Sequence, residues 1–477
     1  MMTALAYGLL ASITWAYVVM VRLLWRRTRD VSIPIGAAIL YMWTFLGAWF
    51  FIGDAAVGFE GYRIGFTYYY LMEKMFPFVV DAKYLMALTG YGAFSIVLLA
   101  VLLVLVPARI APVQEPVVLS RELLVATGLG LLSVSLWAVW PAVKEAVNSG
   151  RPLYLVLHEE SGWRMSVHAL SDRGAGVVLL LGLAVRAAQE RGSGPLREQA
   201  SFLPVWSYAV SVVLLCSWYS LSGNRHTLFT ALVLAMAYLL SAAGRRAIKP
   251  ALMIGAICSV ALLSGGYLRG LAWGPVPTGQ VAPAPKPAFT LPSIVHVPRE
   301  STSMLHKTGE AVFSNELFCA HFSLFGILSR HVPVDGGISF KYLWYSFQPS
   351  DQRPPTAYEH YAKSADLVPG QGYTIHHAAA WFVNGGAVGL VVGGALLGAI
   401  WGLLLRWRAR AVGPVWITAC AALLPLCFVA ALPEVIRSGP EAFKALVFEG
   451  SLLPLMVLAP AMLFGRRSGR THNTSRS

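Results

Sequence analysis

The sequence contains little charge and few of the residues that build soluble proteins. Only 13% of its 477 residues are charged, whereas a typical soluble domain has about 25%. Hydrophobic residues make up 56% of the chain, enough to fill several membrane spans. The composition therefore excludes an ordinary soluble domain and predicts an integral membrane protein.

Cysteine is scarce, and its spacing fits no known kind of metal site. Four of the five cysteines lie in apolar stretches, and only Cys319 lies in a polar segment. There is no CxxC pair and no Cys/His spacing of the kind that binds zinc. The sequence therefore favours neither a disulfide framework nor a structural metal, and we expect no metal and no bound cofactor.

Motifs of nucleotide-using and hydrolytic enzymes are also missing. The sequence has no Walker A loop, no GxGxxG after a strand, no GxSxG elbow and no HExxH. It also lacks a pair of Gly/Pro-broken helices in matching halves, which is typical of secondary transporters. Nucleotide-driven transport and hydrolysis of the soluble type therefore have no support.

What the sequence does contain is a series of eleven apolar stretches of the length that spans a bilayer. They cover residues 4–25, 32–53, 84–107, 122–146, 174–189, 203–221, 226–243, 250–270, 377–405, 413–432 and 446–465. The stretch 174–189 is short. The predicted fold is an all-α polytopic membrane protein with about eleven transmembrane helices.

Positive charge is concentrated at one set of helix ends, and this pattern predicts the topology. The formal charge of +14 therefore reflects membrane anchoring, and we expect no nucleic-acid partner. The clusters are Arg26, Arg27 and Arg29; Arg109 and Arg121; Arg186, Arg191 and Arg197; Arg245, Arg246 and Lys249; Arg406, Arg408 and Arg410; and Arg466, Arg467 and Arg470. With eleven spans and an outer N-terminus, all six clusters lie on the cytoplasmic side, as the positive-inside rule requires.

This topology divides the chain into three parts. Residues 1–270 form an N-terminal helix bundle, 271–376 a large outward loop, and 377–477 C-terminal helices with a basic cytoplasmic tail. Insertions longer than about 15 residues are usually functional or disordered. Within the loop, the helical spacing of apolar residues in 314–328 predicts a helix along the membrane surface.

Two arginines are predicted at the outer face, against the general charge bias. Arg225 lies between two apolar stretches that are joined by almost no loop, and Arg437 lies in the short outer segment 433–445. A charge at the membrane boundary is costly unless it is used, and a guanidinium suits bidentate binding of phosphate. We predict that both clamp a diphosphate. Two alternatives stay open, namely that Arg225 reaches to the lipid headgroups and that nearby carboxylates neutralise Arg437.

Candidate proton-transfer residues flank the large loop. His377, at the start of an apolar stretch, and Glu316, in the predicted surface helix, are candidates for the base that activates a hydroxyl. His376, His226 and Arg353 are candidate substrate contacts. For each residue the alternative is an interfacial or solvated polar side chain without a catalytic role.

Four features of the chain from about residue 222 to its end carry a family resemblance. They are the element SGNRHTLF; the loop segment VPVDGGISFKYLWYSFQP; the loop exit GQGYTIHHAAAWFVNGGAVGL; and the late outer arginine, Arg437. In these features the chain resembles the Wzy-type polymerases of lipid-linked oligosaccharide repeat units, which make O-antigen or exopolysaccharide.

The resemblance implies a GT-C-like glycosyltransferase in the bacterial inner membrane, with its active site facing the periplasm. The donor would be a glycan on undecaprenyl diphosphate and the acceptor a lipid-linked repeat unit, and transfer would invert the anomeric centre. A chain-length regulator and a flippase are implied partners. Two other functions stay open, an O-antigen ligase and a transporter or flippase for lipid-linked glycans. A structural scaffold would have no need for Arg225.

Overall fold

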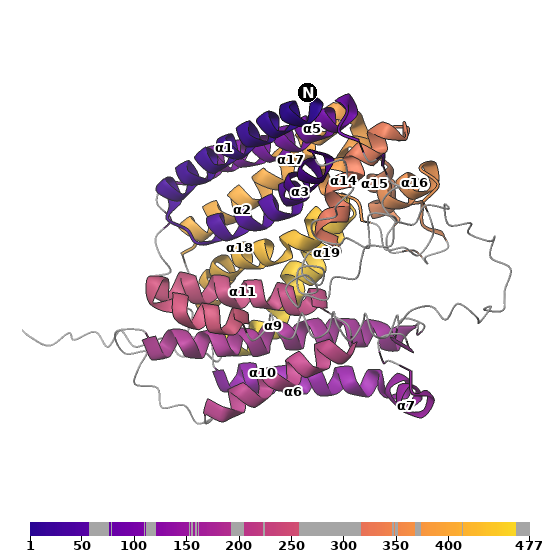
Figure 1. Cartoon of the computed structure of the whole chain (residues 1–477). Helices are drawn as coiled ribbons and strands as arrows, with labels where there is room; N and C mark the ends of the chain where they lie inside the picture. The colour runs from indigo at the N-terminus through magenta and orange to yellow at the C-terminus, as the bar shows by residue number, and fades with distance from the viewer. Residues whose placement is uncertain are drawn as a thin grey trace, which may run out of the picture.

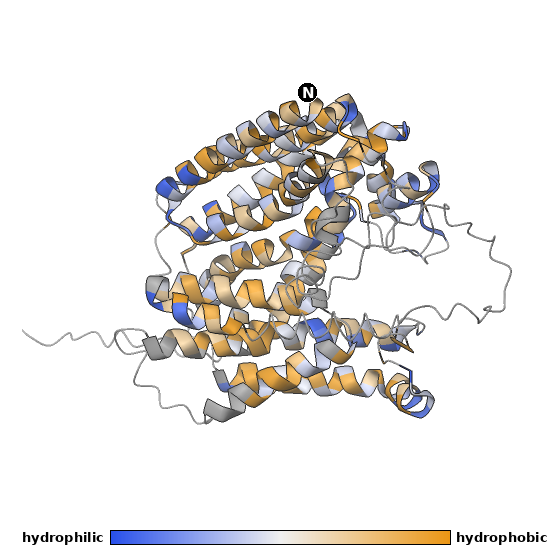
Figure 2. Ribbon diagram, viewed as in Figure 1, coloured by the Kyte–Doolittle hydropathy of each residue, from blue (hydrophilic) through white to orange (hydrophobic). Residues whose placement is uncertain are grey.

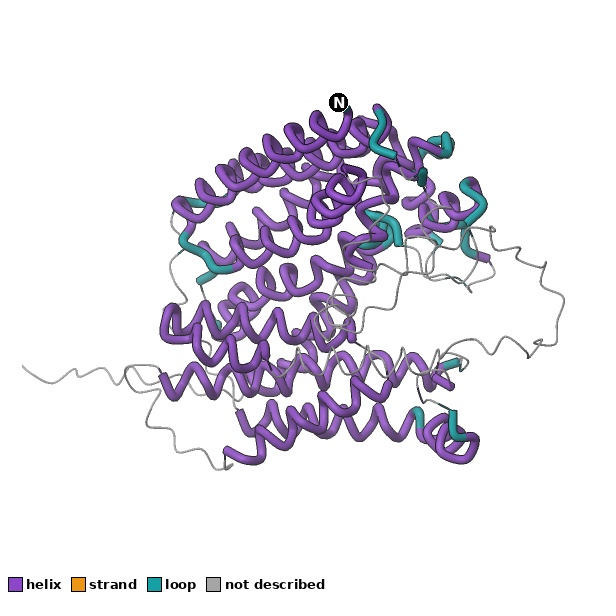
Figure 3. The backbone as a smooth tube through the Cα atoms, in the orientation of Figure 1, coloured by secondary structure: helices purple, strands orange, loops and turns teal. Residues whose placement is uncertain are grey.

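The computed structural model describes most of the helical part of the chain. It describes residues 1–56, 76–77, 79–108, 110, 121–151, 153, 156–157, 160, 162–191, 205–222, 225–256, 316–345, 348, 352–367, 374–412 and 414–463. All regular elements within these ranges are helices (Figure 3). The prediction of an all-α protein is confirmed for this part of the chain.

Six helical segments in the described ranges are long and apolar enough to cross a bilayer. Four of them lie within single helices that precede or follow the large loop: α1 (Met2–Thr28); α5 (Ala82–Leu105); α17 (His377–Arg410); and Trp416–Ile436 within α18 (Val415–Ile436). A fifth, Ser32–Gly53, runs through three consecutive elements, namely α2 (Ser32–Tyr41), η1 (Met42–Leu46) and α3 (Gly47–Ala56). The sixth, Trp163–Val185, is part of α9 (Trp163–Arg191). A seventh span results if α6 (Arg121–Ala138) and α7 (Trp140–Ser149), which meet at a 59° bend, count as one. The protein is thus a polytopic membrane protein; most of the predicted span 250–270 lies outside the described residues.

The long helices lie side by side in a stack with two distinct ends (Figure 1). The helices α7, α14 (Glu316–Ser329), α15 (Ile338–Trp344) and α16 (Ala357–Ser364) gather at one end, here called the loop end. The C-terminus of α1 lies at the opposite end, here called the basic end. The helix shafts are mainly hydrophobic and many of the helix ends are polar (Figure 2), as a protein surrounded by lipid requires.

The stack consists of two helix groups joined by α18. The first group contains α1, α2, α3, α5 and α17, and the second contains α6, α9, α10 (Val205–Ser222) and α11 (Arg225–Ala243). Helix α18 packs on α2 and α17 on one side and on α11 on the other. The C-terminal helices therefore pack into both groups instead of forming a unit of their own.

Glycines allow α17 to pack closely on α5. A side-chain carbon at Gly394 would meet the backbone carbonyl of Phe94, and one at Gly398 would meet that of Leu98. Small residues at such positions let two membrane helices approach until their backbones touch. This contact holds α17, which follows the large loop, in the N-terminal group.

Helix α9 contains the short predicted span but begins earlier than predicted. It starts at Trp163 instead of residue 174, so His168, Asp172 and Arg173 belong to the helix and not to an outer segment. Polar partners explain how the helix accommodates them. Nδ1 of His168 lies 2.8 Å from Oγ of Ser135, and Asp172 accepts a hydrogen bond of 2.6 Å from Nε1 of Trp218.

The predicted surface helix is buried instead. Helix α14 packs against η1, α5 and α17, and its residues from Ala320 to Ile327 are buried or nearly so. Phe322 stacks on Phe76 with ring centroids 4.3 Å apart. The prediction failed because the polar residues of this segment, such as His321, form hydrogen bonds inside the protein and not with water.

Candidate functional site

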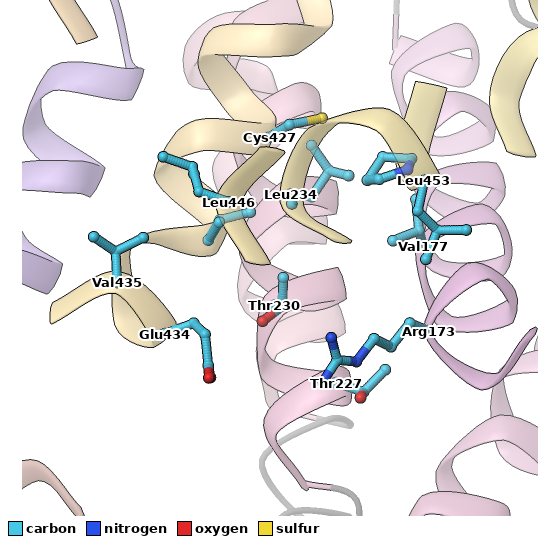
Figure 4. Close-up of a pocket in the computed structure, with 14 residues that line it drawn as sticks. Arg173, Val177, Thr227, Thr230, Leu234, Cys427, Glu434, Val435, Leu446 and Leu453 are labelled. Atoms are coloured by element: carbon cyan, nitrogen blue, oxygen red, sulfur yellow. The ribbon is translucent and has the colours of Figure 1, made fainter. Parts of the chain in front are cut away.

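A small pocket lies between the second helix group and the C-terminal helices, towards the loop end (Figure 4). Its lining residues are Arg173, Val177, Thr227, Thr230, Leu234, Cys427, Ala430, Ala431, Glu434, Val435, Leu446, Gly450, Leu453 and Pro454. The cavity volume is about 50 Å³. Since one water needs ~10–15 Å³ on this scale, the pocket has room for a few waters or one phosphoryl group, but not for a sugar.

The pocket is polar on one side and apolar on the other. Figure 4 shows Arg173 extending from α9 towards Thr227 and Thr230 of α11, while Leu234 and Cys427 lie deeper among apolar side chains. A guanidinium within a membrane helix normally faces a cavity or a partner. This arrangement places a guanidinium next to an apolar surface.

Arg173 belongs to a cluster of four charges from two helices. It is attracted by Glu434 and Asp172 and repelled by Arg437. The cluster is positioned by α9, which supplies Asp172 and Arg173, and by the C-terminal end of α18, which supplies Glu434 and Arg437. Tyr219 fixes α9 here by donating a hydrogen bond of 2.6 Å to the backbone carbonyl of Asp172.

Arg437, one of the two predicted clamp residues, lies beside the pocket and is partly neutralised. It follows the last residue of α18, and both its Nε and its Nη2 lie 3.0 Å from Oε2 of Glu434, one turn earlier. The side chain of Arg437 is 20% exposed. The structure therefore brings Arg437 to the site together with a compensating carboxylate.

The other predicted clamp residue begins α11. Arg225 is the first residue of this helix, and Thr227, two positions later, lines the pocket. The amino end of α11, with the positive end of its dipole, therefore lies near the pocket. The side chains of Arg225 and His226 lie outside the described residues, as does that of Glu316, which begins α14.

Residues 437–447, which follow α18, are here called the C-terminal hairpin. Arg353 lies near this hairpin and not in the pocket lining. Its Nε donates a hydrogen bond of 2.6 Å to the carbonyl of Gln348. Burial lowers the pKa of the Lys444 ammonium in α19 (Ala442–Val447), and the charge of Arg353 lowers that pKa further. The loop and the hairpin thus place two cations near each other.

His377, a predicted base, is fully buried and has both ring nitrogens engaged. Nδ1 donates a hydrogen bond of 2.8 Å to the carbonyl of Ser438, and Nε2 accepts one of 3.0 Å from Nε1 of Trp381. This pair of bonds fixes the neutral tautomer with its proton on Nδ1. The geometry leaves no nitrogen of His377 to accept a proton from a substrate.

His376 and His321 also form part of the buried core. His376 caps α17 by accepting a hydrogen bond of 3.1 Å from the amide of Ala378, and its Nε2 lies 3.1 Å from Oγ1 of Thr44. His321 donates through Nδ1 to the carbonyl of Thr44 over 2.6 Å and accepts at Nε2 from Tyr84 over 3.2 Å. Burial lowers the pKa of His321 to about 4. These histidines join α14, α17 and η1, and neither lines the pocket that contains Arg173.

A carboxylate that the sequence analysis did not select ties the loop helices to the hairpin. Oε1 of Glu441 accepts hydrogen bonds from Oγ of Ser339 over 2.8 Å and from the amide of Ala357 over 2.5 Å. Ser339 Oγ in turn accepts a bond of 2.8 Å from Asn384 of α17. Gly439 gives Glu441 its space, because a side chain there would collide with the carboxylate.

Sequence reasoning missed Arg173, and it treated Glu434 and Glu441 only as carboxylates that could neutralise Arg437. A weak signal for Arg173 was the polar run SDRG just before an apolar stretch. Among the described residues, no group of three His, Cys, Asp or Glu side chains is arranged to hold a metal ion. No family model, curated protein or solved structure matches this chain.

Proposed function

We propose that the protein is a membrane glycosyltransferase that joins polyprenyl-diphosphate-linked oligosaccharide repeat units into a bacterial surface polysaccharide. The reaction would take place at the periplasmic face of the inner membrane. The observation that carries this proposal is the pocket in which Arg173 of a membrane helix faces a chamber with apolar walls. A lipid diphosphate has the same two parts, an anionic group joined to a hydrocarbon chain.

The charges near the pocket suit a diphosphate leaving group. Transfer of the glycan leaves negative charge on the diphosphate, and fixed cations at that point lower the barrier. Arg173 is the arginine that lines the pocket. We assign Arg225 and Arg437 as further cations near the same end of the pocket. The apolar side chains behind Arg173 would contact the first isoprene units of the carrier.

Glu434 replaces His377 as the proposed base, because it lines the pocket while both nitrogens of His377 are engaged. Oε2 of Glu434 is paired with Arg437, but a carboxylate has about four lone-pair sites and can accept a further proton or hydrogen bond. The acceptor hydroxyl oxygen attacks the anomeric carbon, and the bond from that carbon to the diphosphate oxygen breaks. The lipid diphosphate leaves with the electron pair, and Glu434 takes the hydroxyl proton. Since the pocket holds no sugar, both glycans would lie outside its mouth.

The test is the surface-polysaccharide profile of a deletion strain that carries wild-type protein, Arg173→Ala or Arg164→Ala, with membrane levels checked by immunoblot. Arg164 is the matched control, because it is exposed on the same helix and lies over the Trp163 ring. We expect a ladder from the wild type and the control, and single-repeat material from Arg173→Ala. A deletion strain that keeps its ladder would refute the polymerase, and one that loses all glycan from the lipid A core would indicate a ligase.

One observation favours a second function, transport of a lipid-linked glycan. Asp172 and Arg173 lie within the span Trp163–Val185 and not at its end, and charges at such depth are typical of transport pathways. Purified protein in liposomes with a lipid-linked repeat unit separates the two functions. Longer glycans would indicate the polymerase, and movement of unchanged repeat units between leaflets would indicate the transporter.

A further inference from the structure

A second pocket lies at the basic end, separate from the site described above. Its cavity volume is about 370 Å³. It is lined by Trp25, Arg29, Asp30, Val31, Ile110, Leu240, Ser241, Gly244, Ile248 and Arg408. These residues come from the end of α1 and the α1–α2 turn, the segment after α5, the C-terminal part of α17, and the end of α11 with η3 (Gly244–Ala247) and the residue after it. The pocket therefore lies where the two helix groups meet.

A buried arginine is fixed in the pocket wall from two sides. Nη1 of Arg408 lies 2.8 Å from Oδ2 of Asp30, and Nη2 donates a hydrogen bond of 3.2 Å to Oγ of Ser241. Asp30 is itself held, because its Oδ1 accepts a bond of 2.8 Å from the amide of Ser32. The pair links α17 of the first group to α11 of the second.

The guanidinium of Arg408 keeps hydrogen-bonding capacity. Its side chain is 6% exposed, and its contacts with Asp30 through Nη1 and with Ser241 through Nη2 use only two of the five N–H donors of a guanidinium. A buried donor without an acceptor is unfavourable and is satisfied when a ligand supplies an oxygen. Arg408 is thus a preformed donor to an oxyanion in this pocket.

The remaining lining indicates a lipid and not a free anion. Arg29 adds a second cation, so the two arginines outweigh Asp30, and Arg29 is exposed at the end of α1. The apolar lining residues are Trp25, Val31, Ile110, Leu240 and Ile248. Apolar walls with a cationic rim match a phosphate headgroup followed by acyl chains. Inorganic phosphate has no apolar part that could contact these walls.

The position of the pocket identifies the leaflet. It lies beside the basic clusters that end α1 and α17, among them Arg26, Arg27 and Arg410, which the positive-inside rule assigns to the cytoplasmic side. That leaflet carries anionic lipids, and basic pockets between membrane helices on this side bind acidic headgroups. We propose that this pocket binds the phosphate headgroup of an anionic phospholipid through Arg29 and Arg408, and so bridges the two helix groups.

Native mass spectrometry of the delipidated full-length protein tests this proposal. The probes are phosphatidylglycerol, phosphatidylcholine and inorganic phosphate, and the melting temperature is measured with each. The variants are Arg29→Gln and the double variant Asp30→Asn/Arg408→Gln, which leaves no unpaired buried charge. Arg27→Gln is the matched control, since Arg27 is exposed on the same helix end but does not line the pocket.

We expect one phosphatidylglycerol to be retained in preference to phosphatidylcholine and to raise the melting temperature. Its binding should weaken about fivefold in Arg29→Gln, the effect of roughly one interfacial cation, and more in the double variant, but not in Arg27→Gln. Equal retention by Arg29→Gln and Arg27→Gln would overturn the proposal, even if the double variant did not fold. Stabilisation by inorganic phosphate as large as that by phosphatidylglycerol would also overturn it.

Discussion

Nε1 of Trp381 donates a hydrogen bond of 3.0 Å to Nε2 of His377, one turn earlier on α17. With Nδ1 bound to the carbonyl of Ser438, the ring of His377 is a fully bonded part of the core. The most obvious titratable residue at the helix entry is therefore a packing element that fixes α17 to the end of α18. We therefore assign the proposed transfer reaction to Arg173, Glu434 and the charges around them.

His377→Leu should destabilise the protein. The substitution leaves the indole of Trp381 and the carbonyl of Ser438 without their partners, at a cost of about 1–3 kcal/mol for each buried group. Thermal unfolding of purified protein measures this effect. His377→Asn, whose amide can still reach the carbonyl of Ser438, should lose less stability and keep the polysaccharide ladder. An Asn variant that is as stable as the wild type but inactive would restore a catalytic role for His377.

Arg173→Lys should reduce activity but retain more of it than Arg173→Ala. Lysine keeps the charge but loses the planar fork that contacts two phosphate oxygens at once. For the alanine variant we expect a rate loss of about 10²–10³, as for other groups that stabilise developing charge. In vitro polymerisation of a lipid-linked repeat unit measures both rates. Equal rates for wild type and Arg173→Ala would remove Arg173 from the mechanism.

Glu441→Ala should loosen the outer helices from the hairpin. It removes the acceptor shared by Ser339 and the amide of Ala357, and we expect a loss of about 1–3 kcal/mol. Hydrogen exchange in α15 and α16 should rise more than in α5. Lys363→Ala, an exposed change in α16, is the control and should leave exchange unaltered. Unchanged exchange in Glu441→Ala would show that this network does not hold the loop helices.

Acid should destabilise the protein through His321. Burial lowers the pKa of His321 from 6.5 to about 4, so between these values the unfolded chain binds a proton that the folded chain does not. The stabilising contribution is complete above pH 6.5 and is lost as the pH falls to about 4, a change of about 3 kcal/mol. Melting temperatures across this range should fall more steeply for wild type than for His321→Gln. Parallel curves would contradict the prediction.

Gly398→Ala should separate α17 from α5. The added methyl group would meet the backbone carbonyl of Leu98, which cannot move without shifting α5. We expect a destabilisation of about 1–3 kcal/mol, the usual cost of overpacking. Gly130→Ala is the control, because nothing lies within 4 Å of the added carbon there; it should be neutral or slightly stabilising. Similar melting temperatures for the two variants would show that the helices are not in tight contact.

Local hydropathy was sufficient to predict several of the long helices, but not every boundary and not the short helices α15 and α16. The apolar stretches at 4–25, 32–53, 84–107 and 377–405 correspond to described helices with similar ends. The sequence predicts helix α9 too short, because the polar residues before residue 174 are expected in an outer segment exposed to water. Its polar side chains instead bond to Ser135 and Trp218 of neighbouring helices, and a sequence window contains no information about such partners.

Hydropathy and the positions of the arginines are enough to specify a helical membrane protein with one basic end. A bilayer requires apolar helices with internally bonded backbones, and each apolar stretch meets that requirement without help from the others. Which polar residues meet depends on how the helices pack. Arg173 and Glu434 are far apart in the chain, and they come together because of how α9 and α18 are rotated and packed. That packing depends on contacts between helices, such as the close approach of Gly176 in α9 to Tyr219 of α10 and Ala231 of α11, and not on hydropathy.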